Sequence, residues 1–65
     1  MSKTYTEFAA EHAGKHLWTC RAGCSEDGRE LIDVLVYETE EDLCSDDDNS
    51  LAVDRATVVD DRQPA

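Results

Sequence analysis

The chain has 65 residues, of which 16 are acidic and 6 basic, and its formal net charge is −10. A chain of this length forms one small domain, here residues 1–65, with little room for a deep substrate cavity, so we do not expect an enzyme. The negative charge excludes direct binding to nucleic acid and to anionic membranes, because both attract Lys and Arg.

The first predicted element is an amphipathic helix over residues 4–16. Thr4 and Glu7 have the spacing of a capping box, in which each side chain accepts a hydrogen bond from the other residue's backbone N–H. Glu11 and Lys15 are spaced for an ion pair one turn apart. Apolar and histidine side chains recur at helical spacing and form one face: Tyr5, Phe8, Ala9, His12, Ala13 and His16.

A hairpin is expected next. Residues 17–22 are typical of a strand, and the following turn-rich segment closes on Asp27-Gly28, a dipeptide that favours tight turns. Residues 29–38 form the strongest predicted strand. Between Leu31 and Tyr37 they are apolar on both faces apart from Asp33, so this strand is expected at the centre of the sheet.

The acidic segment 39–50 is expected to be a loop or one short helical turn, and 51–59 a third strand. Asp54 and Arg55 place this strand at an edge. The sequence therefore predicts an α+β fold in which one N-terminal helix packs on a three-stranded antiparallel sheet. The predicted core residues are Phe8, Trp18, Leu31, Val34, Val36 and Val58.

Negative charge is concentrated between Glu38 and Asp48, where seven of eleven residues are acidic and none is basic. Charge of one sign repels itself, so a cationic partner, bound cations or a salty solvent must offset it. Carboxylates held by a folded domain can occupy a groove built for the phosphates of nucleic acid. We predict that these carboxylates bind the partner: Glu38, Glu40, Glu41, Asp42, Asp46, Asp47 and Asp48.

Four residues have side chains of the type that bind zinc: His12, His16, Cys20 and Cys24. Structural zinc sites usually use two separated pairs of ligands, whereas three residues lie between each of these neighbours. We therefore expect no metal and no cofactor, and keep a zinc-stabilised domain as an alternative. Residues 46–50 have alternating oxygen ligands but lack the glycine and glutamate of a calcium loop. Three cysteines, an odd number, indicate reduced thiols, with a pairing of Cys44 to Cys20 or Cys24 as the alternative.

In its length, its charge of −10 and its acidic run from Glu38 to Asp48, the chain resembles small acidic phage-encoded inhibitors that mimic DNA, including anti-CRISPR proteins. The resemblance implies an inhibitor that blocks the nucleic-acid-binding surface of a cationic protein or complex, such as a CRISPR surveillance complex. Because no secretory or membrane-spanning pattern is seen, we expect a location in the host cytoplasm. The alternatives are an antitoxin-like regulatory or structural module and a halophile-adapted acidic domain, whose repulsion salt would screen.

Overall fold

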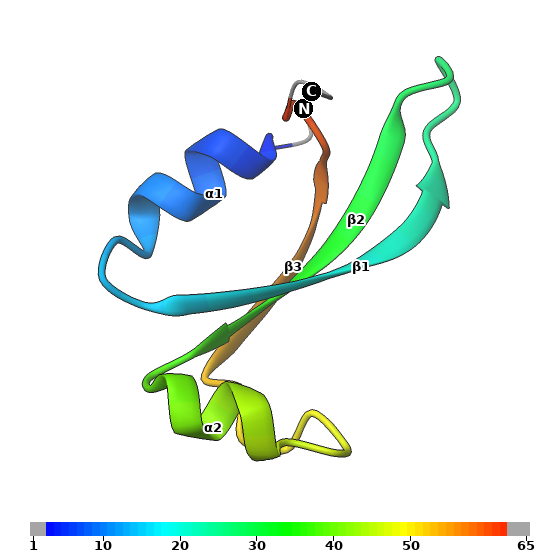
Figure 1. Cartoon of the computed structure of the whole chain (residues 1–65). Coiled ribbons are helices and arrows are strands. Elements are labelled where there is room, and N and C mark those ends of the chain that lie inside the picture. Colours follow the sequence, from blue (N-terminus) through cyan, green and yellow to red (C-terminus); the bar gives the residue numbers. More distant parts are fainter. Residues whose placement is uncertain (1–2, 63–65) are drawn as a thin grey trace.

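The structure is a computed structural model that describes residues 3–62. The chain forms an α+β fold with the elements α1 (Tyr5–Glu11), β1 (His16–Cys24), β2 (Glu30–Tyr37), α2 (Glu40–Ser45) and β3 (Asp54–Val59) (Figure 1). The strands form one antiparallel sheet in the order β1-β2-β3. The predicted fold class, the central position of β2 and the edge position of β3 are therefore confirmed.

Helix α1 begins where the sequence predicted and ends earlier. Thr4 Oγ1 accepts from the N–H of Glu7, and Glu7 Oε1 accepts from the N–H of Thr4, each at 3.2 Å, so the capping box is confirmed. The helix ends at Glu11 and not near His16. Gly14 has a positive φ of 85°, a conformation that glycine adopts readily, and the chain turns there towards β1.

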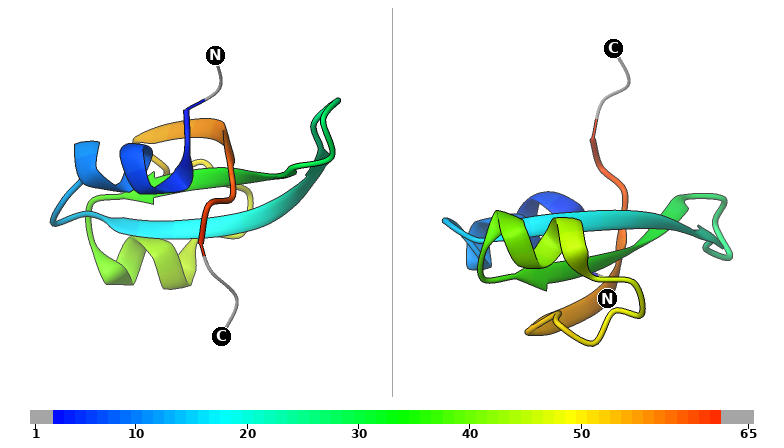
Figure 2. Two further views of the ribbon diagram at one scale, coloured as in Figure 1. Left: turned by 90° about the horizontal axis from the view of Figure 1, so that it is seen from above. Right: turned by 60° about the horizontal axis from the view of Figure 1, so that its bottom comes forward.

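The sheet is covered by one helix on each face. Figure 2 shows α1 and α2 on opposite sides of the strands. Phe8 of α1 packs with alternate residues of β2 and with β3 in the main core, which consists of Phe8, Ile32, Val34, Val36 and Val58. The intervening residues Leu35 and Tyr37 are each 2% exposed and point to the side of α2. Strand β2 is therefore buried on both faces, as its apolar sequence predicted.

The predicted core was only partly right. Phe8, Val34, Val36 and Val58 are buried. Leu31 is half-buried, and Trp18 is 51% exposed, so its assignment to the core is wrong. Trp18 lies opposite Leu35 on edge strand β1, and α2 does not bury its ring. The buried residues that the sequence did not identify are Ile32, Leu35, Tyr37 and Val59.

The segments that join the elements follow local signals. Between β1 and β2, the N–H of Ser25 donates to the carbonyl of Arg29 at 2.7 Å, and Gly28 has a φ of 87°, so the predicted turn is confirmed. The predicted helical turn is α2. Strand β3 begins at Asp54, later than predicted, because residues 50–53 form a turn and a bend.

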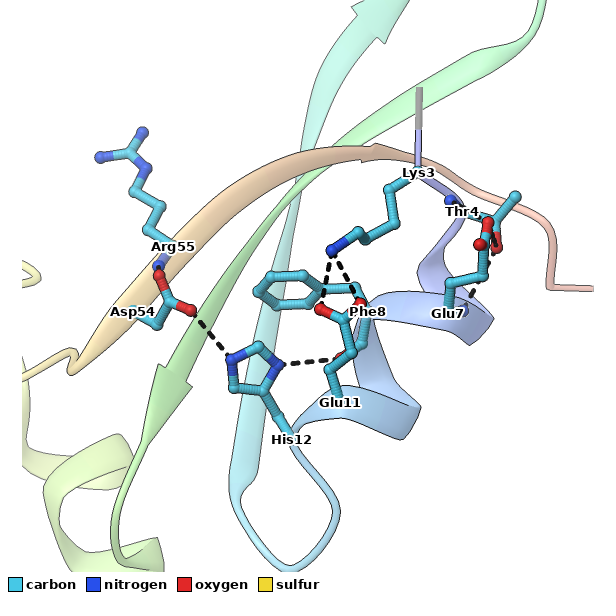
Figure 3. A network of polar contacts seen from close by, with 8 residues as sticks. All are labelled: Lys3, Thr4, Glu7, Phe8, Glu11, His12, Asp54 and Arg55. Carbon is cyan, nitrogen blue, oxygen red and sulfur yellow. Dashed lines mark hydrogen bonds and ion pairs between the residues drawn. The ribbon is translucent and has the colours of Figure 1, made fainter. Parts of the chain in front are cut away.

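His12 joins the end of α1 to the start of β3 (Figure 3). Its Nδ1 lies 2.9 Å from the carbonyl oxygen of Phe8, and its Nε2 lies 2.9 Å from Asp54 Oδ2. Both partners are acceptors, so only the doubly protonated ring can donate to both. The Phe8 carbonyl and then the Asp54 carboxylate raise the pKa of His12 above its ordinary value of 6.5, against the opposing effect of partial burial.

We predict that this contact makes stability depend on pH near neutrality. Because the pKa of His12 is higher in the folded protein, its contribution is complete below pH 6.5, the ordinary value, and is lost as pH rises through the folded pKa. The urea concentration at the midpoint of unfolding should therefore decrease as the pH is raised from about 6 to about 8. His12→Gln should flatten this slope, and His16→Gln should keep it, since His16 forms no ion pair within residues 3–62. An unchanged slope in His12→Gln would contradict the assignment.

Candidate functional site

Every Lys and Arg side chain of the chain forms an ion pair with an acid inside residues 3–62. The closest N···O separations run from 2.6 to 3.8 Å. The predicted pair Glu11–Lys15 is wrong, because Glu11 pairs with Lys3 before the helix and Lys15 pairs with Glu38, 23 residues away. The six pairs are Lys3–Glu11, Lys15–Glu38, Arg21–Glu30, Arg29–Asp27, Arg55–Asp33 and Arg62–Asp60.

The remaining negative charge collects at one end of the molecule. With the His12–Asp54 contact included, seven of the 16 acids form ion pairs within residues 3–62 and the other nine do not. Six of the nine lie in α2 and the loop that follows it, and we call them the acidic end: Glu40, Glu41, Asp42, Asp46, Asp47 and Asp48. Glu38 differs from the rest of the predicted set, because it pairs with Lys15 at 2.6 Å.

Helix α2 favours carboxylates at its start. Thr39 is its N-cap, and the Thr39 Oγ1 accepts from the N–H of Asp42 at 3.1 Å. Glu40, Glu41 and Asp42 occupy the first turn, where the helix dipole stabilises negative charge. Glu40 and Glu41 are exposed and Asp42 is half-buried, so the fold presents these carboxylates at the surface. The local structure thus offsets part of the mutual repulsion within the acidic end.

The loop after α2 is held by hydrogen bonds. The Tyr37 hydroxyl donates to Asp46 Oδ2 at 2.7 Å, and this bond, together with burial, raises the pKa of Tyr37 to about 12. Asp48 Oδ1 accepts from the N–H of Ser50 at 3.1 Å, and contacts with Ser50 lower the pKa of Asp48. Asn49 has a φ of 65°, a left-handed conformation that asparagine tolerates. These contacts give the carboxylates of Asp46 and Asp48 defined positions.

An open hollow of about 420 Å³ lies between this loop, α2 and the sheet. Its lining is part aromatic, part aliphatic and part acidic: Trp18, Tyr37, Leu43, Cys44, Asp46, Asp47 and Asn49. Tyr37 and Leu43, which lie next to the acidic run or within it in the sequence, both line the hollow. Leu51, which follows the run, is 43% exposed and is not part of the lining. Trp18 was missed as a site residue because its large apolar side chain favoured a core assignment.

The four potential zinc ligands do not converge. His12 contacts Asp54 on the α1 side, whereas His16, Cys20 and Cys24 lie along β1. Four residues of strand span about 13 Å, which separates these three side chains by far more than a metal site allows. Residues 3–62 hold no group of three or more His, Cys, Asp or Glu side chains placed to bind a metal ion. The three cysteines are exposed and free.

Fold and surface together define a small α+β protein with one acidic end and a mixed aromatic and acidic hollow beside it. Comparisons with protein-family models, with curated proteins and with solved structures found no match to this chain. None of the helices within residues 3–62 has the length and apolar character needed to cross a membrane. Its function therefore has to be argued from its own surface.

Proposed function

We propose that this protein is an acidic inhibitor that mimics nucleic acid and blocks the DNA- or RNA-binding surface of a cationic protein or complex in the host cytoplasm. A CRISPR surveillance complex is one such target. The observation that carries the proposal is the division of charge. The described Lys and Arg side chains are all engaged by acids elsewhere, which leaves six carboxylates of the acidic end without a base.

The mechanism is the replacement of phosphates by carboxylates. Arg and Lys side chains that line a nucleic-acid groove would pair with the acidic end, and arginine can form two parallel hydrogen bonds with one carboxylate. Each exposed ion pair contributes only about 0–1 kcal/mol, so tight binding requires several pairs at once. The opposite charges of the two surfaces would also accelerate encounter at low salt. While the inhibitor occupies the groove, nucleic acid cannot enter it.

The charge distribution favours this function over a halophile-adapted domain. Adaptation to salt requires acids over the whole surface, because hydration and screening act everywhere. Here the acids of the sheet, including Glu30, Asp33 and Asp54, are matched by a positively charged or titratable partner. Six of the nine acids that stay unmatched lie in one segment of 9 residues, from Glu40 to Asp48.

Affinity capture tests the proposal. The folded protein is immobilised, a lysate of the host cell is passed over it, and bound proteins are eluted with duplex DNA and identified by mass spectrometry. We expect a basic nucleic-acid-binding protein or complex in the DNA eluate. A free peptide of residues 38–48 on the same support is the control, and it should retain less because its carboxylates are not held in place. Retention that DNA does not reverse would contradict the proposal.

A further inference from the structure

We infer that the hollow beside α2 receives an arginine side chain of the partner protein. This inference rests on the proposed function and deepens it, because it names one contact through which the partner is recognised. The candidate residues come from three elements that the fold brings together: Trp18 from β1, Tyr37 from β2, and Asp46 and Asp47 from the loop after α2.

An aromatic wall is the first requirement for such a site. Trp18 is 51% exposed although its indole is the largest apolar side chain in the protein. It borders the hollow together with Leu43 and the ring of Tyr37. The flat guanidinium of arginine stacks on an indole face and is weakly hydrated, so burying it there costs little. A partner arginine would cover a surface that this fold leaves open to water.

Uncompensated negative charge is the second requirement. Asp46 and Asp47 line the hollow, and neither forms an ion pair with any residue from 3 to 62. Tyr37 satisfies Asp46 Oδ2, whereas the buried Asp46 Oδ1 has no hydrogen-bond partner among the described residues. Because Asp46 Oδ1 is covered, a partner guanidinium would pair first with the exposed carboxylate of Asp47. The guanidinium carries five N–H groups and matches the geometry of a carboxylate.

Charge complementarity selects this occupant over an apolar one. The lining contains two carboxylates and no Lys, Arg or His, and the acidic end continues from it along α2. An apolar side chain would cover these carboxylates without pairing them, which is unfavourable. A lysine ammonium could pair with them, but it is strongly hydrated and lacks the flat shape with which a guanidinium stacks on an indole, so it would gain less from Trp18. The combined aromatic and acidic lining therefore fits arginine best.

The test uses the fluorescence of Trp18, which is the single tryptophan of the chain. The full protein is titrated with the blocked tripeptide Gly-Arg-Gly and with analogues that carry lysine or citrulline in place of arginine. We expect the fluorescence to change in a saturable way as the arginine peptide is added. The lysine peptide should bind at least about threefold more weakly. The citrulline peptide, which keeps the shape of arginine without its charge, should bind at least about tenfold more weakly. Equal binding of citrulline or of lysine would overturn the inference.

Two variants locate the binding. Asp47→Asn should lower the affinity for the arginine peptide by about threefold, and Asp46→Asn/Asp47→Asn should lower it by about tenfold. Asp46 also accepts a hydrogen bond from Tyr37, so circular dichroism must first show that the double variant is folded. The Asp47→Asn variant leaves this hydrogen bond in place and tests the site by itself. Glu26→Gln/Asp27→Asn removes the same charge at the far hairpin and should change the affinity less than twofold. An equal loss in the two double variants would overturn the site. Failure here would leave capture through α2 unaffected, so the two proposals are separable.

Discussion

Neutralising the first turn of α2 should nearly abolish retention of the cationic partner. For the variant Glu40→Gln/Glu41→Gln/Asp42→Asn we expect a loss of affinity of about 100-fold, which corresponds to three ion pairs of slightly under 1 kcal/mol each. The three carboxylates share the first turn of α2, where Glu40 and Glu41 are exposed and Asp42 is half-buried, so a partner that contacts this end of the helix would lose its acidic contacts in the variant. Binding of the captured partner to the immobilised variant, measured by surface plasmon resonance at low salt, gives the result.

Neutral substitutions are preferable to charge reversal at these positions. Three lysines at the start of α2 would face the positive end of the helix dipole and would destabilise the helix by about 0.3–1 kcal/mol each. The matched control is Glu26→Gln/Asp27→Asn/Glu30→Gln, which changes the net charge equally in the hairpin between β1 and β2. Glu26 and Asp27 precede β2 and Glu30 is its first residue, so the eight-residue length of this strand separates them from α2 by roughly 25 Å. Equal losses in both variants would mean that net charge alone determines binding, and an unchanged α2 variant would remove the acidic end from the mechanism.

Removing the ring of Phe8 should unfold the protein. Phe8 is 3% exposed and is the one residue of α1 that is fully buried in the main core. Truncating a buried phenylalanine to alanine costs about 3–5 kcal/mol. A domain of this size has only about 3–5 kcal/mol of stability in total, and the self-repulsion of the acids lowers it further. For Phe8→Ala we expect no cooperative thermal transition in far-ultraviolet circular dichroism at low salt.

Two control variants distinguish the loss of core packing from the mere loss of a large side chain. Phe8→Leu should fold, because it keeps most of the apolar volume in contact with the sheet. Trp18→Ala removes a larger ring from a position that is 51% exposed, and it should cost no more than about 1 kcal/mol. A Phe8→Ala protein with a thermal midpoint close to that of the unchanged chain would show that α1 is not needed to close the core.

The parts of the fold that depend on neighbouring residues were predictable from sequence. Thr4 and Glu7 identified the start of α1, and the apolar run from Leu31 to Tyr37 identified the central strand. The exposure of Trp18 was not predictable, because it depends on where α2 lies over the sheet. The contact between His12 and Asp54 joins residues 42 positions apart, and no local signal indicates it.

Some features of the candidate site were also predictable from neighbouring residues, and others were not. Composition identified the acidic run, and the N-capping of α2 by Thr39 follows from local sequence. The separation of Glu38 from the acidic end required the position of Lys15, which lies 23 residues away. The hollow required β1, β2 and the loop after α2 to meet. A charge run therefore identifies a segment in sequence, and only the ion pairs of the folded chain show which of its carboxylates have no base beside them.

The central claim is that the acidic end occupies the site of nucleic acid on its partner. An equilibrium competition tests it most directly: the purified partner is bound to fluorescently labelled nucleic acid, and the protein is added while anisotropy is recorded. We predict complete displacement, with a midpoint that rises in proportion to the concentration of nucleic acid, and a midpoint about 100-fold higher for the neutralised α2 variant. A ternary complex of partner, nucleic acid and this protein would contradict the claim.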